Sequence, residues 1–537
     1  MNRFFTDNSL NITSTKVIIL VAVFFITFYN FAFFSNVLEV YPLNKKNIAF
    51  LSSLAFGCTG LFVLLLSLVC YKHTIKPVLT FVFLLSSLAS YFMDSYNTPI
   101  DDDMINNIVH TDFAESLDLF SFKLVLYVVF LGVFPSYHIY KSNIIFKTRW
   151  QEVISRIKLF TVTLLSILGV IYIFSDYYSS FFREHKPLRY YTNPSYYIYS
   201  GGQYAGSLFA SSQLPLKTIG QDAKVPISES HRELLIFIVG ETARADRFSL
   251  NGYAKETNPQ LKKENIVNFT NFWSCGTSTA TSVPCMFSKF TASKYNKEEI
   301  HSTENVLDVL NRAGVNILWL DNNSDSKGVA ERVPYQSYKS PDINTICDPE
   351  CRDVGMLVNI QTYINEHPQG DIMIVLHQMG NHGPAYYKRY PSAFEKFKPT
   401  CKTNQLEDCS KEKLDNAYDN AILYTDFFLS KVIALLKQNS SGFESAMFYV
   451  SDHGESLGEN GLYLHGLPNI IAPDTQRHVP AVFWIDDNYN EIDVEQLKNK
   501  ENVEFSHDNI FHTILGFMEV ESSVYDKTMD ILHNSSD

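Results

Sequence analysis

The sequence predicts an α-helical membrane domain of five spans, followed by an exported α/β domain. Three observations predict this architecture. Five long apolar runs lie before about residue 178, short β-type apolar runs separated by helical segments follow residue 233, and six cysteines in close pairs occur after the apolar runs. A chain of 537 residues is also too long for one ordinary domain, so we expect at least two hydrophobic cores.

The five apolar runs have the length and composition of membrane spans, which need about 20 apolar residues each. They cover residues 16–38, 48–70, 77–93, 124–140 and 159–174, and the last three are short enough to extend into their aromatic flanks. The first run is too long, and too poor in small residues at its end, to be a cleaved signal peptide. We therefore interpret it as a membrane anchor.

Loop charges predict the orientation of these spans. The loop between spans two and three and the loop between spans four and five are basic, and they contain Lys72, His73, Lys76, Lys141, Lys147, Arg149 and Arg156. The acidic loop that holds residues 101–103 has no Lys or Arg before Lys123. By the positive-inside rule the basic loops are cytoplasmic, although Lys45 and Lys46 in the first loop disagree. The N-terminus is then predicted to be cytoplasmic, and everything after the fifth span lies outside.

The cysteines support this placement. Two of the eight lie in a predicted span, and the other six form the close pairs Cys275 and Cys285, Cys347 and Cys351, and Cys401 and Cys409. An even set in close pairs favours disulfides in an oxidising compartment, although neighbour pairing is an inference because six cysteines allow many connectivities. A zinc cluster is the alternative interpretation, but Cys-x-x-Cys spacing is absent.

The predicted domains are a membrane domain at residues 1–178, a linker or interfacial segment at 179–230, and an α/β domain at 231–537. The middle segment is rich in Tyr, Phe, Ser and Gly, which is typical of a membrane interface and equally of a linker that packs on the next domain. The net charge of -13 comes mainly from the C-terminal part. This charge argues against a nucleic-acid-binding surface.

Polar clusters follow four of the predicted strands. The β-type runs cover residues 234–239, 315–320, 372–376, 446–450 and 479–484, and they indicate a mostly parallel sheet. The first four runs lead into polar residues at 241–244, 321–327, 377–384 and 451–456. Because ligands bind at the carboxyl ends of strands in such sheets, the four clusters predict an active site at one edge of the sheet.

Residues in these clusters suit a catalytic zinc ion. Asp452 and His453 are adjacent at a strand end, and Glu241 supplies a second carboxylate. Carboxylate and imidazole ligands suit zinc, and a catalytic site keeps a position open for the substrate. A nucleophile is expected in the hydroxyl-rich loop at 275–285, because a metal or a base can activate a hydroxyl.

The residues of that loop alone do not choose the nucleophile. Five hydroxyls are candidates, namely Thr277, Ser278, Thr279, Thr281 and Ser282. A Ser/Thr-rich turn with a helix cap is the alternative interpretation of the whole segment.

Four sequence blocks resemble the signature blocks of the lipid A phosphoethanolamine transferases, including the mobile colistin-resistance enzymes. The blocks lie at residues 240–246, 274–280, 381–384 and 451–459, and the resemblance covers the chain from end to end. It implies that the exported domain has an alkaline phosphatase/sulfatase-like fold. It also implies a ping-pong reaction, in which a phosphoryl group is carried by the enzyme between donor and acceptor.

The resemblance assigns roles to individual residues. It implies that Thr279 is the nucleophile and that the zinc ligands are Glu241, Thr279, Asp452 and His453. It places Asn323, Lys327, His382 and His465 around the phosphoethanolamine group, sometimes with a second zinc, and His377 is a weaker neighbour. Without the resemblance, a lysine such as Lys327 is more often a surface charge and His465 a structural histidine. Glu455 more often supports a ligand or caps a helix than binds a metal.

The resemblance further implies the substrates and the location. The donor is phosphatidylethanolamine, the acceptor is a lipid A phosphate, and the intermediate is a phosphoethanolamine-threonine. The protein is then a multi-pass protein of a Gram-negative inner membrane with a periplasmic catalytic domain, and its activity confers polymyxin and colistin resistance. One departure concerns the loop between Cys347 and Cys351, which is shorter than in family members and makes this pairing the least secure.

Three other functions are weighed against this one. Transfer of phosphoethanolamine or phosphoglycerol to another surface glycan would use the same nucleophile and metal. A sulfatase-like hydrolase needs a Cys or Ser in a C/S-x-P-x-R context, whereas Cys285 is followed by Met286, Phe287 and Ser288. A non-catalytic membrane scaffold predicts losses among the metal ligands, and all four residue types are present.

Overall fold

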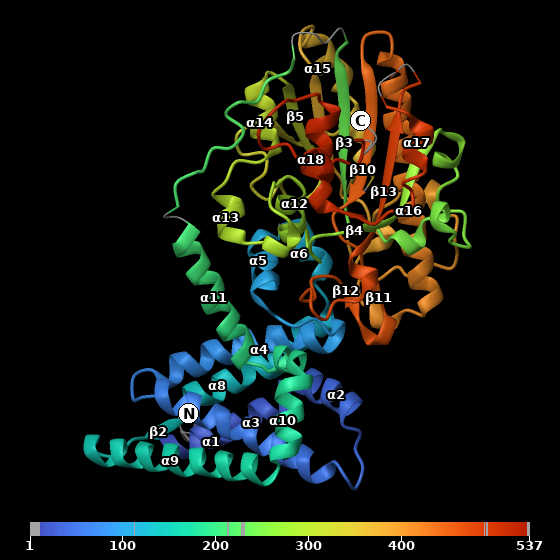
Figure 1. Cartoon of the computed structure of the whole chain (residues 1–537). Coiled ribbons are helices and arrows are strands. Elements are labelled where there is room, and N and C mark those ends of the chain that lie inside the picture. Colours follow the sequence, from blue (N-terminus) through green and yellow to red (C-terminus); the bar gives the residue numbers. More distant parts are fainter. Residues whose placement is uncertain are drawn as a thin grey trace, which may run out of the picture. The chain divides into compact units, whose positions relative to one another are not determined.

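The computed structural model describes residues 11–533 except 112, 212–213, 227–230, 349, 488 and 490–491. The predicted cytoplasmic N-terminus and the predicted end of the linker at residue 230 lie outside the described residues. The chain divides into two compact units (Figure 1). The helical unit comprises Met1–Asp102 and Phe120–Gln203, and the α/β unit comprises Asp103–Leu119 and Tyr204–Asp537. Residues 103–119 therefore group with the α/β unit, whereas the sequence predicted one membrane domain at 1–178.

The helical unit contains the predicted spans. Among the described residues, four helices have the length and composition to cross a membrane, and the number rises to five if a bent pair counts as one span. The helices of the unit are α1 (Ser14–Phe28), α2 (Phe31–Val40), α3 (Ile48–Val69), α4 (Ile75–Tyr96), α7 (Phe122–Tyr127), α8 (Phe134–Lys141), α9 (Arg149–Ile173), α10 (Ser175–Glu184) and α11 (Ser195–Ser211), and short strands lie at β1 (Asn11–Thr13) and β2 (Asn143–Ile145). A π-helical segment at Val128–Val133 joins α7 to α8 into one span.

The first span is the bent pair. Helices α1 and α2 meet at an angle of 59°, and Asn30 lies at the break. The buried Asn30 amide donates to the Phe25 carbonyl oxygen at 2.9 Å and to the Asn193 carbonyl oxygen at 2.6 Å. A side-chain amide thus satisfies backbone groups that the bend releases from the helix, which keeps a break tolerable in an apolar environment.

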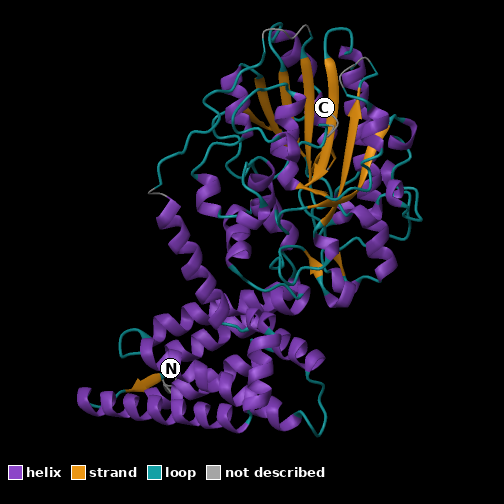
Figure 2. Cartoon of the chain, viewed as in Figure 1, coloured by secondary structure: helices purple, strands orange, loops and turns teal. Residues whose placement is uncertain are grey.

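The α/β unit is built on an eight-stranded sheet with the order β14-β4-β13-β10-β3-β9-β5-β6 (Figures 1 and 2). The strands are β3 (Glu233–Gly240), β4 (Ile266–Trp273), β5 (Asn316–Asp321), β6 (Tyr335–Ser337), β9 (Ile372–His377), β10 (Glu444–Ser451), β13 (His478–Ile485) and β14 (Phe505–Ser506). Strands β10, β3, β9, β5 and β6 are parallel, while β13 runs antiparallel to both of its neighbours. The prediction of a mostly parallel sheet is confirmed. Strand β4 was not predicted from the sequence.

Helices cover both faces of this sheet. Residues of α12 (Thr279–Met286), α14 (Val306–Ala313), α17 (Val494–Lys498) and α18 (Ile510–Phe517) pack in one core, and residues of α15 (Ile360–Glu366) and α16 (Lys411–Asn439) pack in the other. The unit also contains α5 (Asp102–His110), α6 (Phe113–Leu119) and α13 (Lys297–His301). Small two-stranded sheets pair β7 (Cys347–Asp348) with β8 (Glu350–Cys351), and β11 (Ser456–Leu457) with β12 (Tyr463–Leu464).

The continuous apolar run of β3 reflects burial on both sides. Leu235, Phe237 and Val239 belong to a core shared with α12, α14 and α18, whereas the alternate residues of β3 belong to a second core shared with α15 and α16. Side chains of a strand alternate between faces, so a strand covered on both faces is apolar at every position. This arrangement makes β3 a rigid support for the residues that follow it.

We expect Phe237→Ala to lower the free energy of unfolding of the α/β unit by about 3–5 kcal/mol, because it empties a fully buried site. The Phe237 ring lies 5.4 Å from the Phe287 ring and 5.5 Å from the Phe448 ring. Denaturant titration of the detergent-solubilised full chain measures the change. Ile470→Ala is the control, because Ile470 is 80% exposed and should shift the free energy by less than about 0.5 kcal/mol. Equal effects of the two changes would contradict this account of the core.

Candidate active site

The polar strand ends meet at one edge of the sheet. Strands β10, β3, β9 and β5 are consecutive neighbours, and their last residues pair across the sheet as Ser451 with Gly240, Val239 with His377, and His377 with Asp321. Residues that follow these strands therefore emerge side by side. The predicted convergence of the four polar clusters is a consequence of this register.

Glu241, Asp452 and His453 form a compact buried cluster. Each offers a ligand atom, and these atoms lie within 4.8 Å of one another. All three side chains are fully buried. His453 Nε2 lies 3.5 Å from Glu241 Oε1 and 3.4 Å from Asp452 Oδ2. His453 Nδ1 lies 2.9 Å from the Gly454 carbonyl oxygen, so a proton on Nδ1 leaves Nε2 as the nitrogen that faces the carboxylates.

Hydrogen bonds from neighbouring loops fix the two carboxylates. The Thr242 backbone NH donates to Asp452 Oδ1 at 3.0 Å, and the Thr242 hydroxyl donates to Glu241 Oε1. Asn323 Nδ2 donates to Glu241 Oε2 at 2.7 Å. Thr242 has a positive φ of 57°, a conformation that a β-branched residue seldom adopts. In this conformation, the backbone NH and the hydroxyl of Thr242 both point toward the carboxylates of the cluster.

A close backbone approach supports the same cluster. Gly380 follows β9 with a φ of 48°, and a Cβ atom there would lie 2.8 Å from the Glu241 carbonyl oxygen. The Asn381 NH donates to that carbonyl at 3.0 Å. A side chain at position 380 would therefore push the loop after β9 away from Glu241.

Thr279 is the loop hydroxyl that touches the cluster. It is the first residue of α12, and its Oγ1 lies 3.2 Å from Glu241 Oε2 and 3.3 Å from His453 Nε2. Other hydroxyls of the loop are engaged elsewhere or isolated. The Thr277 hydroxyl donates to the Leu467 carbonyl oxygen at 2.7 Å, Ser278 Oγ lies 3.5 Å from Thr281 Oγ1, and Ser282 Oγ is buried without a hydrogen-bond partner.

The electrostatics of the cluster favour a bound cation. Burial, followed by the adjacent Glu241 charge, raises the pKa of Asp452 well above its ordinary value. Burial also opposes ionisation of Glu241, but the nearby imidazoles and the Thr242 hydroxyl lower its pKa. Asp452 Oδ2 is buried without a hydrogen-bond partner. Two carboxylates, an imidazole and a hydroxyl form a donor set that fits a divalent cation such as zinc.

His382 and His465 lie next to the cluster. The His465 ring centroid is 4.3 Å from that of His453 and 5.8 Å from that of His382. His382 Nδ1 is buried without a hydrogen-bond partner, and burial lowers the pKa of His382 to about 4. His382 is therefore neutral at pH 7. His465 Nδ1 lies 3.3 Å from the fully buried Glu455, which also accepts a hydrogen bond from the Tyr386 hydroxyl at 3.0 Å.

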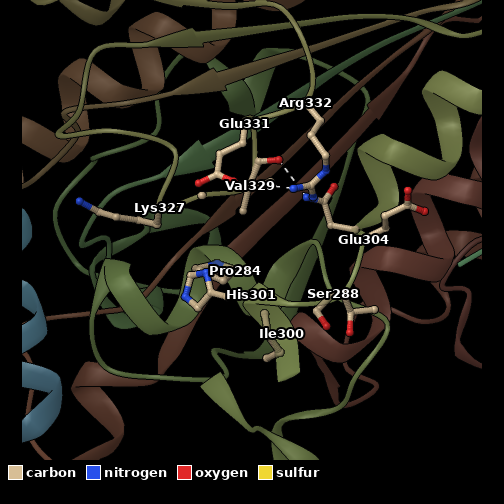
Figure 3. A pocket seen from close by; sticks show the side chains of 12 residues that line it. Pro284, Ser288, Ile300, His301, Glu304, Lys327, Val329, Glu331 and Arg332 are labelled. Atoms are coloured by element: carbon tan, nitrogen blue, oxygen red, sulfur yellow. Dashed lines mark hydrogen bonds and ion pairs between the residues drawn. The ribbon is translucent and has the colours of Figure 1, made fainter. Parts of the chain in front are cut away.

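Asn323 and Lys327 occupy different positions in the loop after β5. Asn323 contacts Glu241 directly, whereas Lys327 Nζ donates to Ser324 and lies 3.3 Å from Asp325. Lys327 is one of the residues that line a cavity of about 100 Å³. Figure 3 shows that the Lys327 side chain extends away from His301, Glu331 and Arg332, which line the same cavity. His377, the weaker neighbour, is buried, and its Nδ1 lies 3.0 Å from Asp321 Oδ2.

A charged cluster that the sequence did not predict contacts the backbone of His382. The fully buried Arg389 donates from Nε to the His382 carbonyl oxygen at 2.6 Å, from Nη1 to Glu350 at 2.7 Å and from Nη2 to Asp118 at 2.7 Å. Lys388 also pairs with Asp118. Asp118 lies in α6, far away in sequence, so no local motif signals this contact. Burial alone would raise the pKa of Asp118, but Arg389 and Lys388 outweigh it and hold the pKa below its usual range.

The predicted pairing of neighbouring cysteines is confirmed. The three disulfides are Cys275–Cys285, Cys347–Cys351 and Cys401–Cys409. The first encloses the start of α12 and so restrains Thr279. The second encloses the turn that carries Glu350, the partner of Arg389. Two of the disulfides thus brace loops that carry residues at or behind the cluster.

Comparisons with known proteins identify the family of the chain. Residues 233–520 match the Sulfatase family model, and residues 58–208 match the model described as phosphoethanolamine transferase EptA/EptB. The chain is 46% identical over 477 residues to the phosphatidylethanolamine transferase Mcr-2 of Escherichia coli, a match that covers 87% of this chain and 88% of the relative. It is 41% identical to the phosphoethanolamine transferase EptA of Escherichia coli strain K12, over 99% of this chain and 98% of that protein.

A solved structure resembles the whole chain. The integral membrane lipooligosaccharide phosphoethanolamine transferase A of Neisseria meningitidis superposes with a TM-score of 0.93 at 36% identity, covering 97% of this chain and 99% of that one. This likeness extends over both units. The predicted combination of a helical membrane domain and a sulfatase-like α/β domain is confirmed.

We expect Asp118→Asn to lower the free energy of unfolding of the α/β unit by about 3 kcal/mol at neutral pH, because it leaves buried Arg389 without one of its ionic partners. Since the folded-state pKa of Asp118 is lowered, its stabilisation is present above the ordinary pKa and is lost as the pH falls through the folded-state pKa. The difference from wild type should therefore shrink in acid. Denaturant titration at several pH values measures it.

Lys402→Gln is the control for this prediction. Lys402 pairs with Glu395 at 3.1 Å, but its side chain is 62% exposed, so its loss should cost less than about 1 kcal/mol. A loss for Asp118→Asn that is no larger than this control, or that does not depend on pH, would contradict the assigned role of the Arg389 cluster.

Proposed function

This chain belongs to the phosphoethanolamine transferase EptA/EptB family, and we propose that it transfers phosphoethanolamine from phosphatidylethanolamine to a lipid A phosphate. The observation that carries the proposal is the position of Thr279. Its hydroxyl contacts both Glu241 and His453 at the start of a helix. The resemblance of the signature blocks supports a lipid A acceptor, and the Neisseria meningitidis relative is named for a lipooligosaccharide substrate.

Zinc is the proposed cofactor, held by Glu241, Asp452, His453 and the Thr279 oxygen. The unpartnered Asp452 Oδ2 and the exclusively oxygen and nitrogen donors support this assignment. When bound, zinc lowers the pKa of a coordinated hydroxyl and offsets charge on phosphoryl oxygens. His382, His465, Asn323 and Lys327 remain proposed contacts of the phosphoethanolamine group, and a second zinc would take its ligands from the same histidines.

In the first half of the reaction, Thr279 Oγ1 attacks the phosphorus of the donor. An Oγ1–P bond forms, the P–O bond to diacylglycerol breaks, and the hydroxyl proton ends on the departing glycerol oxygen. Glu241 Oε2 lies within reach of that proton, at 3.2 Å from Oγ1. The N-terminus of α12 directs its backbone NH groups and its positive dipole end toward the anionic phosphoryl group. A phosphoethanolamine-threonine remains.

In the second half, a lipid A phosphate oxygen attacks the same phosphorus. A new O–P bond forms, the Oγ1–P bond breaks, and Thr279 Oγ1 takes up the proton that the acceptor phosphate hydroxyl loses. His382 is neutral at working pH because burial lowers its pKa, so it donates or accepts hydrogen bonds without adding charge. In the product, the ammonium group of the added phosphoethanolamine offsets negative charge at the modified lipid A phosphate. Cationic peptides such as polymyxins and colistin then bind the cell surface less well, which is the proposed route to resistance.

Both substrates are lipids, so the reaction is proposed to take place at a bilayer surface. We assign the helical unit to the inner membrane of a Gram-negative cell, with a cytoplasmic N-terminus and a periplasmic α/β unit. The three disulfides support an oxidising compartment for that unit. The basic loops at the other ends of the spans support the orientation.

A second acceptor is the alternative, because relatives differ in what they modify. Proteins named Kdo(2)-lipid A phosphoethanolamine 7''-transferase match this chain at 26% identity, well below the Mcr and EptA relatives. The acceptor named for these less similar proteins is therefore kept as the alternative. Transfer to a core sugar or another glycan would use the same nucleophile.

Thr279→Ala should abolish transfer, because it removes the hydroxyl that carries the phosphoryl group and leaves the fold intact. Mass spectrometry of lipid A from Gram-negative cells that express each variant measures the gain of one phosphoethanolamine unit. Ser282→Ala is the matched control, since Ser282 is a hydroxyl of the same loop without a hydrogen-bond partner and should keep the activity. Modified lipid A in cells with Thr279→Ala would show that another group is the nucleophile. Unmodified lipid A with the wild-type protein in the membrane would overturn the acceptor.

Asp452→Asn should weaken zinc binding by roughly 100-fold or more, because even supporting residues of metal sites contribute about 10- to 100-fold. Metal analysis of the purified full chain, dialysed against a zinc buffer at neutral pH, gives the stoichiometry. Asp342→Asn removes an exposed carboxylate and should leave the zinc content unchanged. Equal zinc in the wild-type and Asp452→Asn proteins would remove Asp452 from the ligand set.

A further inference from the structure

A second cavity lies wholly within the helical unit, whereas the cluster of Glu241, Asp452 and His453 belongs to the α/β unit. Its volume is about 990 Å³, and its walls come from the end of α3, the strand β2 and the first turns of α9. This volume is at the upper end of the range for small-molecule sites. Neither the transfer chemistry nor the family resemblance assigns it a ligand.

The cavity has an apolar wall and a basic rim. Leu68, Ile144 and Phe160 are among the apolar lining residues. Four lining side chains carry a positive charge, namely Lys72, Lys147, Arg149 and Arg156. Such a division between apolar and basic surface matches an amphiphile with an anionic head.

Arg156 supplies a built contact for an anion. It is only 7% exposed, and its Nε donates to Glu152 Oε1 at 3.0 Å. Its Nη1 and Nη2 atoms are buried without a hydrogen-bond partner. Burying the two donor ends of a guanidinium without acceptors is costly, and their fork geometry matches two oxygens of a phosphate group. The unsatisfied donors therefore indicate an oxyanion in the cavity.

Glu152 does not supply the missing acceptors. It is the one acidic residue among the described lining residues, and it already accepts from Ser14 Oγ at 2.6 Å, from the Lys147 NH at 3.1 Å and from Arg156 Nε. With this carboxylate engaged, the rim keeps a net positive charge. A zwitterionic head would place its ammonium group among these cations, whereas an anionic head would not.

We propose that this cavity binds an anionic phospholipid, whose phosphodiester is held by the Arg156 guanidinium and whose acyl chains lie along the apolar wall. The site shares no residue with the cluster of Glu241, Asp452 and His453. By the positive-inside rule it faces the cytoplasmic leaflet, where anionic lipids meet basic loops. The ligand class is set by the head-group charge, as in phosphatidylglycerol.

Native mass spectrometry of the delipidated full chain tests the proposal. The protein is offered equal amounts of phosphatidylglycerol and phosphatidylethanolamine with identical acyl chains. Wild type should retain phosphatidylglycerol in preference, and Arg156→Gln should retain it roughly tenfold less, as expected for the loss of a charge-assisted hydrogen-bonded pair. Lys141→Gln removes a charge from the same basic loop but not from the lining, so it should behave as wild type. Equal retention of both lipids by wild type, or no loss in Arg156→Gln, would overturn the proposal.

Two further measurements make the result of this experiment decisive. If Arg156→Gln does not fold, the double variant Lys72→Gln, Lys147→Gln changes only exposed lining residues and should still reduce the preference for phosphatidylglycerol. An unchanged preference in this variant would count against the site. Excess glycerol phosphate should leave the bound lipid in place, because it lacks acyl chains for the apolar wall. Complete displacement by glycerol phosphate would assign the cavity to a soluble anion instead.

Discussion

The repulsion between two buried carboxylates is the constraint on which the site depends. Glu241 and Asp452 offer oxygen atoms within 4.8 Å of each other in a fully buried cluster. At an effective dielectric constant of about 20, two unit charges at such a distance repel by about 4 kcal/mol. A single hydrogen bond contributes about 1 kcal/mol, or about 2 when one partner is charged, so one donor cannot balance this repulsion. The cluster is stable only if several donors, a shared proton or a cation offsets the charge.

The fold supplies these donors from rigid segments. Thr242 follows β3 and Asn323 follows β5, and both donate to the carboxylates. Because β3 is covered by helices on both faces, the loops at its carboxyl end cannot drift to relieve the repulsion. The uncompensated negative charge therefore favours a divalent cation at this cluster.

The sequence predicted much of this arrangement for a physical reason. Apolar runs and the polar residues that follow them are local signals, and a parallel register brings such strand ends together without further information. For this reason the sequence alone identified Glu241, Asp452 and His453 as candidate metal ligands. The choice of Thr279 among five hydroxyls as the proposed nucleophile rests on a resemblance to known proteins and on its contacts with Glu241 and His453. Strand β4 was missed because its run, with Asn268, Thr270 and Asn271, is broken by polar residues and is covered only in part.

The Arg389 cluster could not be predicted, because its partners are distant in the chain. Asp118 belongs to the segment between helices α4 and α7, yet its carboxylate, together with Glu350, neutralises the guanidinium that holds the His382 carbonyl. A fragment that begins after residue 203 would lack Asp118 and leave Arg389 with Glu350 as its ionic partner. The loop of His382 is thus stabilised in part by a segment of the chain that precedes the last span. Results obtained with an isolated α/β fragment therefore describe a site from which one supporting charge has been removed.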